Sequence, residues 1–315
     1  LAEALGAAAV PFRSGKGVVG DDTPMGAMLA AGKILWPETD VALVIGSRFE
    51  LLDMRWRWRP KGVKIIRIDI DAAEMRRLHA DVGIVADAEA ACRALLAAID
   101  SPRDLERRMR RVAMAKTQGA EDVETVQPQI AYLRAIREAL PRAGLITDEI
   151  SQMGFASWYG FPVFEPRSFV TSGYQGTLGS GFPTSLGVKA AFPDRPVVAI
   201  CGDGGFLFGA NEMASAVQYG LNVVAIVFNN SAYGNVRRDQ KLGFEGRVIG
   251  SELTNPDFMK YAEAFGVRGW RVESPEALGG AIDEALAANA PALIEVVSDA
   301  DAESDPWGFI HPQFE

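Results

Sequence analysis

Two short polar clusters carry the chemistry of this sequence. The first is Gly202-Asp203-Gly204-Gly205, and the second is Asn229-Asn230, about two dozen residues further along the chain. Carboxylate and amide oxygens are hard ligands suited to Mg²⁺ or Ca²⁺. The glycines around Asp203 leave room for a diphosphate to approach backbone N–H groups. The pattern therefore predicts a site that binds a diphosphate through a divalent cation.

The elements predicted around these clusters bring them to one edge of a sheet. Apolar runs predict buried strands at Val197–Cys201 and Val223–Phe228, with a helix at Ala210–Tyr219 between them. Each cluster then follows the carboxyl end of a strand, where parallel α/β sheets bind their ligands. The alternative is that the first cluster is only a tight βα turn and the second only the start of a loop.

The rest of the chain alternates between strand-like and helix-like segments. Further strands are predicted at Asp40–Gly46, Val63–Asp69, Leu145–Thr147, Ser168–Thr171, Gly269–Val272 and Leu293–Val297. Further helices are predicted at Thr23–Leu35, Asp87–Ile99, Gln129–Leu140, Leu178–Ala191, Asp257–Phe265 and Pro275–Asn289. This regular alternation is typical of α/β domains with parallel sheets.

The separation of the two clusters resembles the signature of thiamine diphosphate enzymes, in which GDG is followed about two dozen residues later by NN. Within that superfamily the chain is similar to the acetolactate synthase group from its first residue to about Val297. The resemblance implies an α/β fold with two doubly wound parallel-sheet domains. A partial Rossmann-like middle domain, N-terminally incomplete, would span 1–100, and a linker 101–128. The thiamine diphosphate-binding domain would span 129–300, and a tail 301–315. Because the chain opens as if within a helix, we expect it to be part of a longer protein.

The resemblance also implies roles for residues in and after the two clusters. Asp203, the side chain of Asn230 and the backbone carbonyl of Ala232 would ligate Mg²⁺, and two diphosphate oxygens and a water would complete an octahedron. Backbone N–H groups would meet the same diphosphate oxygens at Gly204, Gly205, Tyr233 and Gly234. Asn235 follows directly and is also expected at the cofactor.

A glycine-rich segment upstream, Ser172–Pro183, resembles the GGLGTMGFGLP segment of the family. The carbonyl of Gly176 would accept a hydrogen bond from the aminopyrimidine of the cofactor. Leu178 would be the catalytic residue, because a large apolar side chain between the two rings enforces a bent cofactor. The alternative is a strand-to-helix turn with Leu178 packed in the core. Ser151 and Gln152 occupy positions that contact the diphosphate in acetolactate synthases, and both can donate hydrogen bonds.

Departures from the family bear on the substrate. Acetohydroxyacid synthases carry a Met and a Trp after the second cluster, where this chain has Asn235 and Asp239. These polar residues predict a different pocket and disfavour a role in branched-chain biosynthesis. Arg237 or Arg238 would pair with a substrate carboxylate, or else would belong to a solvated helix face.

A flavin is a possible further cofactor. Gly15-Lys16-Gly17-Val18-Val19-Gly20 matches GxGxxG, but the spacing alone is weak evidence for a dinucleotide. In the family this region is a loop of the middle domain and not a nicotinamide fingerprint, but the middle domain binds FAD in some relatives. Arg48, after Gly46-Ser47, would be available to such a nucleotide, whereas the Gly-Met-His-Gly contact of flavin-containing members has no clear match near Met28.

The function implied by the resemblance is a thiamine diphosphate- and Mg²⁺-dependent lyase or carboligase acting on a 2-oxo acid. The alternatives are a non-oxidative 2-oxo acid decarboxylase and a non-catalytic nucleotide-binding module. No segment matches the pyrimidine-binding domain that supplies the activating glutamate in the family. We therefore expect that domain to complete the site, and the protein to be a homo-oligomer, dimer or tetramer, assembled through it.

Bulk composition narrows the classes of partner. The formal net charge of −9 argues against a chain-wide surface for nucleic acids or anionic membranes. No apolar run reaches the roughly 18 residues of a membrane-spanning helix. The two cysteines, Cys92 and Cys201, lie in apolar stretches and are expected to be buried thiols. These features predict a cytoplasmic protein with a small-molecule substrate.

Overall fold

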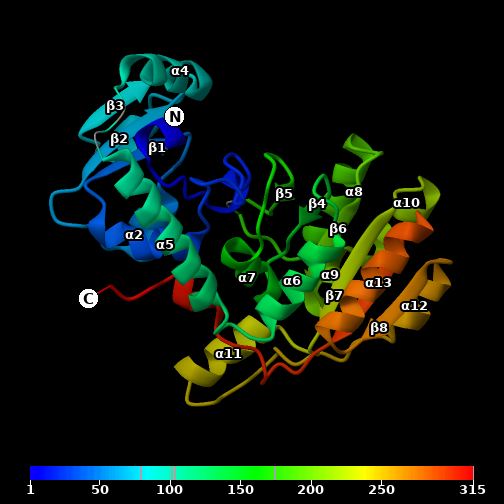
Figure 1. Cartoon of the computed structure of the whole chain (residues 1–315). Helices are drawn as coiled ribbons and strands as arrows, with labels where there is room; N and C mark the ends of the chain where they lie inside the picture. The colour runs from blue at the N-terminus through cyan, green and yellow to red at the C-terminus, as the bar shows by residue number, and fades with distance from the viewer. Residues whose placement is uncertain (79, 101, 103, 174, 315) are drawn as a thin grey trace. The chain divides into compact units, whose positions relative to one another are not determined.

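The computed structural model describes residues 1–315 except 79, 101, 103, 174 and 315. The chain folds into two compact units (Figure 1). Unit 1 contains Leu1–Phe12, Asp21–Asp122 and Trp307–Glu315, and unit 2 contains Arg13–Gly20 and Val123–Pro306. The domains expected from the sequence are contiguous ranges of the chain, whereas each of these units combines separate segments. The expected domain boundaries stay predictions.

Unit 1 is built on a three-stranded parallel sheet in the order β1-β2-β3. Its strands are β1 (Val41–Ile45), β2 (Lys64–Asp69) and β3 (Val82–Val85). Its helical elements are α1 (Ala2–Leu5), α2 (Leu29–Leu35), η2 (Trp36–Glu38), η3 (Leu51–Trp56), α3 (Glu74–Arg77), α4 (Ala88–Ala98) and α5 (Leu105–Val123). The sequence did not predict β3, a short strand interrupted by Gly83.

The predicted helix at Thr23–Leu35 begins later than expected, at Leu29. Gly26 forms a parallel bridge with Ala9, and its N–H also lies 3.1 Å from the Thr23 hydroxyl. These contacts hold the first part of the segment in an extended path, so the helix prediction was wrong there.

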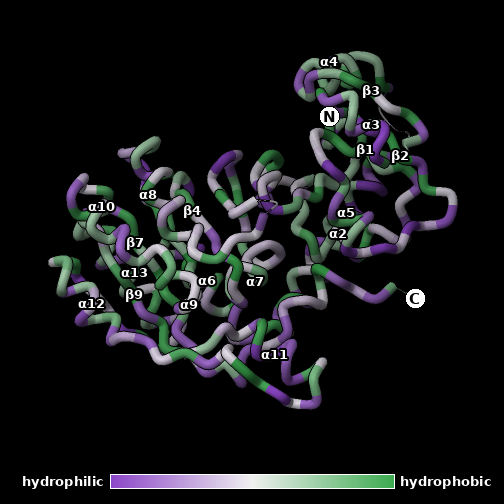
Figure 2. Tube along the Cα trace, turned by 180° about the vertical axis from the view of Figure 1, so that it is seen from behind, coloured by the Kyte–Doolittle hydropathy of each residue, from purple (hydrophilic) through white to green (hydrophobic). Residues whose placement is uncertain are grey.

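Unit 2 contains a six-stranded sheet in the order β5-β4-β6-β7-β9-β8, and every pairing is parallel. The strands are β4 (Leu145–Thr147), β5 (Phe169–Val170), β6 (Val197–Gly202), β7 (Val223–Asn229), β8 (Arg268–Val272) and β9 (Ala292–Val297). The strands predicted from apolar runs agree with these six, which confirms the expected α/β class with parallel sheets. Figure 2 shows the hydropathy of each residue along the trace. The strand β7 is almost entirely apolar and buried.

Helices cover both faces of this sheet. The helices of unit 2 are α6 (Gln129–Ala139), α7 (Gln152–Gly160), α8 (Gly181–Ala191), α9 (Asp203–Gly209), α10 (Met213–Gln218), α11 (Gly234–Gly243), α12 (Phe258–Ala264) and α13 (Pro275–Ala288). Short 3₁₀ turns add η1 (Arg13–Gly15) and η4 (Ala210–Glu212), and η5 (Pro306–Phe309) begins at the last residue of unit 2 and continues into unit 1. On one face Phe182, Phe206 and Phe258 pack with alternate residues of β6 and β7, as the two-residue period of a strand requires. On the other face α6 packs beside α13 (Figure 1), and Tyr132 meets the ring of Phe228 edge-on at 5.5 Å.

The GxGxxG segment belongs to unit 2 and lies in turns, not between a strand and a helix. Gly17 has a φ of +82°, and a Cβ there would lie 2.1 Å from the carbonyl oxygen of Glu165. Arg13 Nη1 donates to the Gly173 carbonyl at 2.8 Å, and Lys16 Nζ donates to the Trp158 carbonyl at 3.2 Å. Close packing therefore accounts for this glycine, and the strand–turn–helix context of a dinucleotide fingerprint is absent here.

Among the residues that the structure describes, no helix is both long enough and apolar enough to cross a membrane.

Candidate cofactor-binding site

The two polar clusters follow the ends of neighbouring strands. Gly202 pairs with Phe228 in the β6–β7 register, so Asp203 and Asn229 emerge at the same edge of the sheet. Asn255 connects them, because its Nδ2 donates to Asp203 Oδ2 at 2.6 Å and to Asn229 Oδ1 at 2.8 Å. Sequence reasoning missed Asn255, which lies 52 positions beyond Asp203 and follows no strand. The amide holds the Asp203 carboxylate toward the end of β7.

Asp203 is only 2% exposed, and burial raises the pKa of its carboxyl above the usual range. Hydrogen bonds from Asn255 and from backbone N–H groups partly offset this effect on the pKa. Loss of water penalises the charged form of a buried acid. A divalent cation would supply the positive charge that stabilises this carboxylate.

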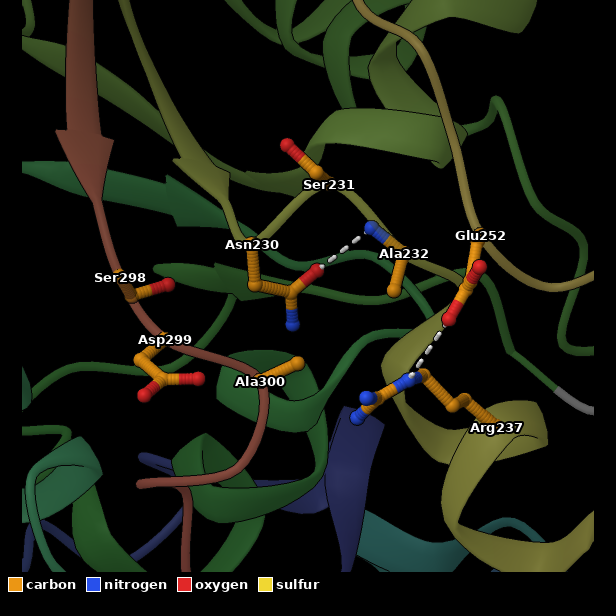
Figure 3. Close-up of a pocket in the computed structure, with 8 residues that line it drawn as sticks. All are labelled: Asn230, Ser231, Ala232, Arg237, Glu252, Ser298, Asp299 and Ala300. Carbon is orange, nitrogen blue, oxygen red and sulfur yellow. Dashed lines mark hydrogen bonds and ion pairs between the residues drawn. The ribbon is translucent and has the colours of Figure 1, made fainter. Parts of the chain in front are cut away.

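Asn230 and Ala232 line a pocket of about 360 Å³ (Figure 3). Asn230 Oδ1 accepts the Ala232 N–H at 3.1 Å, which folds the chain back directly after β7. The other lining residues are Ser231, Arg237, Glu252, Ser298, Asp299 and Ala300. The last three belong to the segment that follows β9. The pocket therefore lies between the second cluster and the start of the C-terminal tail.

The tail also brings an acid to the site. Asn230 Nδ2 lies 3.3 and 3.2 Å from the two carboxylate oxygens of Glu303. Burial, together with the charges of Asp203 and Asp299, raises the pKa of Glu303 to about 7, although the Asn230 hydrogen bond lowers it. This contact could not be predicted from the sequence, since Glu303 lies in a tail without predicted elements.

The glycines of the two clusters fit a closely approaching ligand. A Cβ on Gly204 would lie 2.4 Å from the Tyr233 ring, and one on Gly234 would lie 2.8 Å from Asn230 Nδ2. Two of the predicted diphosphate donors already have partners: the Gly204 N–H donates to Asp203 Oδ1 at 2.9 Å, and the Tyr233 N–H donates to the Ser251 carbonyl at 2.8 Å. Diphosphate contact through the N–H groups of Gly205 and Gly234 stays a prediction.

The glycine-rich turn upstream packs against the first cluster's helix. Gly176 has a φ of +60°, and a Cβ on Gly179 would lie 2.6 Å from Phe208 Cβ on α9. Leu178 is 37% exposed, so it is not a core residue as the alternative interpretation required. Tyr174, in the same segment, lies outside the described residues. The turn thus presents an apolar side chain near the helix that begins at Asp203.

Ser151 and Gln152 open α7. The Ser151 hydroxyl accepts the Gly154 N–H at 3.0 Å and so caps this helix. Gln152 is 6% exposed, and its Cγ would lie 3.7 Å from a Cβ on Gly234. Its Oε1 is buried without a hydrogen-bond partner among the described residues. A polar ligand beside Gly234 would give the Gln152 amide oxygen the hydrogen-bond partner that it lacks in the described part of the chain.

The basic residues of α11 pair with the tail. Arg237 donates to both oxygens of Asp301 at 2.6 and 3.2 Å, and Arg238 Nη1 donates to Asp305 at 2.6 Å. Lys241 reaches Asp301 at 2.5 Å. Arg237 and Arg238 therefore pair with carboxylates of this chain, where the sequence analysis expected a substrate carboxylate. Asn235 is the second residue of α11, and Asp239 lies 3.5 Å from Arg238.

Two buried acids, Asp148 and Glu149, directly follow β4 and were not among the predicted site residues. Asp148 Oδ2 accepts from Trp158 Nε1 at 2.6 Å, and Glu149 Oε1 accepts the Gly179 N–H at 2.5 Å. Burial raises the pKa of each to about 7. They follow the same rule as the two clusters, because they are polar residues at the carboxyl end of a parallel strand.

These pKa values predict that unit 2 loses stability as the pH rises. The ordinary pKa values, 3.8 for Asp148 and 4.5 for Glu149, apply to the unfolded chain. Between about pH 5 and 7 the native state therefore holds protons that the unfolded state has released, so the free energy of unfolding falls as the pH rises. From pH 5 to pH 8, Asp148→Asn should gain about 3 kcal/mol relative to the wild type, at about 1.4 kcal/mol per pKa unit. Urea unfolding at both pH values measures this, with the exposed Asp194→Asn expected to follow the wild type. An equal pH dependence in wild type and Asp148→Asn would contradict the prediction.

The fold and the placement of polar residues define a parallel α/β protein whose candidate ligand site lies at the carboxyl ends of β4, β6 and β7. Comparison with known families gives two matches. Residues 149–296 match the thiamine pyrophosphate enzyme C-terminal TPP-binding domain, and residues 1–95 match the thiamine pyrophosphate enzyme central domain. The chain belongs to the thiamine pyrophosphate enzymes and is acetolactate synthase-like.

Curated relatives with different names match most of the chain. A probable acetolactate synthase large subunit of Methanocaldococcus jannaschii is 33% identical over 90% of this chain and 52% of its own length. A 2-hydroxyacyl-CoA lyase of Oryza sativa subsp. japonica is 34% identical over 96% of this chain and 57% of its own length. A probable 2-ketoarginine decarboxylase of Pseudomonas aeruginosa is 32% identical over 84% of this chain and 49% of its own length. The chain thus spans about half the length of the curated relatives that it matches.

Proposed function

We propose that the protein containing this chain is a thiamine diphosphate- and Mg²⁺-dependent lyase or carboligase acting on a 2-oxo acid. In this proposal Asp203, Asn230 and the Ala232 carbonyl hold the metal. The observation that carries it is the amide of Asn255, which ties the Asp203 carboxylate to Asn229 across two adjacent strand ends. Oxygen donors gathered in this way suit Mg²⁺.

The donor set and the space around it support the cofactor. Asp203 would offset the metal's charge, and Gly205 and Gly234 would let the diphosphate approach backbone N–H groups. Gln152 would donate to the diphosphate through its amide. When bound, thiamine diphosphate supplies an electron sink for the cleavage and formation of bonds next to a carbonyl carbon.

The residues of this chain would then position and shield the reacting groups. Leu178 would press on the cofactor from the turn before α8, and Gly176 would accept from the aminopyrimidine. The tail after β9 would exclude water, since Asp299 and Ala300 line the pocket beside Asn230. The activating glutamate would come from a pyrimidine-binding segment outside this chain, contributed within a homo-oligomer.

Product analysis tests the reaction class. We expect the full-length protein to convert pyruvate with an added aldehyde into an acyloin in the presence of thiamine diphosphate and Mg²⁺. Release of free aldehyde alone would instead favour a 2-oxo acid decarboxylase, an alternative supported by the name of the Pseudomonas aeruginosa relative. No turnover of any 2-oxo acid would contradict both.

A thermal-shift comparison tests the non-catalytic alternative and the flavin. Stabilisation by thiamine diphosphate with Mg²⁺, and not by ADP, is expected if unit 2 binds the cofactor. FAD remains a possible ligand of unit 1, where the loop after β1 contains Arg48. The carbonyl oxygens of Ser47 and Arg48 accept from Arg67 and Arg77, which orders this loop. A shift with ADP or FAD alone would favour the nucleotide-binding module.

A further inference from the structure

Glu149 is a buried acid that the proposed function does not use. Its side chain is 1% exposed, and among the described residues the groups that shift the pKa of its carboxyl are backbone N–H groups and Asp148, with no cation. A buried carboxylate without a counter-charge is costly unless hydrogen-bond donors stabilise it. The backbone groups around Glu149 therefore indicate which role its carboxylate has.

The backbone groups around Glu149 belong to two different turns. The Gly179 N–H donates to Glu149 Oε1 at 2.5 Å, and the nearby backbone N–H groups of Gly181 and Gly202 lower the pKa of the Glu149 carboxyl, although burial raises it overall. Gly179 and Gly181 belong to the turn that leads into α8, whereas Gly202 directly precedes Asp203. One carboxylate thus accepts a hydrogen bond from the first turn and lies beside the backbone of the second.

The fit on the second turn is close. A Cβ on Gly205, in the first turn of α9, would lie 2.3 Å from Glu149 Oε2. A Cβ on Gly181 would lie 2.9 Å from Glu149 Cβ. The side chain therefore fills the space between the start of α8 and the start of α9, and the glycines leave room for it.

In the proposed function, the two turns contact opposite ends of thiamine diphosphate. Gly176 and Leu178 lie in the first, where the cofactor rings would bind, and Asp203 begins the second, where the metal and diphosphate would bind. A bent cofactor makes contact with both at once, so the separation between the turns sets whether it can be held in the reactive geometry.

We propose that Glu149 is a positioning residue that sets the distance between the Leu178 turn and the Asp203 turn, because it accepts the Gly179 N–H of the first and packs closely against Gly205 of the second. This inference rests on the proposed function, because it assigns the two turns to the two ends of thiamine diphosphate. Glu149 acts through the backbone of these turns and does not touch the substrate.

The variant that tests the proposal is Glu149→Gln in the full-length protein. Glutamine keeps the shape but replaces one acceptor oxygen by an NH₂ group, which would face the N–H donors. The matched control is Asp148→Asn, which neutralises the adjacent buried acid; Asp148 accepts from Trp158 and contacts neither turn in the hydrogen bonds above. Because both variants remove one buried charge from the same strand end, their difference isolates the connection between the turns.

Three measurements give the outcome: the melting temperature, the Kd of thiamine diphosphate at saturating Mg²⁺ by calorimetry, and the split between kcat and KM for the 2-oxo acid. Substitution of a residue that holds metal ligands in place typically lowers metal affinity or activity by about 10- to 100-fold. We expect Glu149→Gln to weaken thiamine diphosphate binding at least about tenfold and to lower kcat with KM for the 2-oxo acid nearly unchanged, whereas Asp148→Asn binds the cofactor as the wild type does.

Equal affinities for the cofactor in wild type and Glu149→Gln would overturn the proposal. So would equal losses in Glu149→Gln and Asp148→Asn, because the effect would then be one of buried charge alone. In both cases the wild type still binds thiamine diphosphate, so the proposed function survives. If the wild type does not bind thiamine diphosphate with Mg²⁺, the proposed function fails and this inference fails with it.

Discussion

Asp203→Ala is expected to abolish measurable binding of thiamine diphosphate in the presence of Mg²⁺. The substitution removes the only carboxylate among the three proposed metal ligands, so the charges of the metal and the diphosphate lose their partner in the protein. It also leaves Asn255 Nδ2 without one of its two acceptors. We expect the affinity to fall at least about 100-fold, which corresponds to roughly 2.7 kcal/mol. Calorimetric titration of the full-length protein with the cofactor, at several Mg²⁺ concentrations, measures this loss.

The control is Asp283→Ala, an exposed aspartate on α13. It changes the net charge by the same amount and should leave the cofactor's Kd unchanged. An Asp203→Ala variant that still binds thiamine diphosphate in a Mg²⁺-dependent manner would refute the metal assignment.

Leu178→Gly is expected to lower turnover far more than cofactor affinity. Leu178 is 37% exposed, so its truncation creates little cavity in the core. The proposed role is to hold the cofactor bent, and proximity of reacting groups contributes to the barrier and not to ground-state binding. We expect kcat to fall about 100-fold while the Kd of thiamine diphosphate rises less than about fivefold, as expected when a lost contact acts mainly in the transition state. Steady-state kinetics together with calorimetry measure the two effects separately.

Leu96→Gly, on α4 of unit 1, makes the same change at a 48% exposed leucine and controls for general destabilisation. Its kcat should match the wild type at temperatures below unfolding. Parallel losses of kcat and cofactor affinity in Leu178→Gly would argue that Leu178 is only a binding contact.

The strands of unit 2 were predictable because each is a short apolar run with a turn or polar residue at its end. The run Val197–Cys201 differs from β6 by one residue, and Leu145–Thr147 equals β4. The helix that begins at Asp203 was missed, because glycine-rich GDGGF has poor intrinsic helix propensity. Tertiary packing of Phe206 against Phe182 and Phe258 stabilises this helix instead.

Of the candidate site, the residues carried by local motifs were predictable, and those brought in by distant segments were not. Asp203 and Asn230 each lie two positions beyond the end of a predicted strand. Asn255 and Glu303 reach the site from loops, and no spacing rule relates them to the motifs. Glu149 had a usable signal, since it lies two positions beyond the end of β4, yet the type of residue alone did not reveal that it would accept the Gly179 N–H.

The path of residues 13–20 limits how the protein can be cut for study. These residues supply Arg13 and Lys16 to unit 2, although the chain on both sides of them belongs to unit 1. A recombinant fragment that starts at Val123 would lack the guanidinium that binds the Gly173 carbonyl and lies 5.2 Å over the Trp158 ring. It would also leave Asp148 without the nearby positive charge of Arg13. Isolating the cofactor-binding half therefore calls for splicing or co-expressing this eight-residue peptide with it, and not for simple truncation.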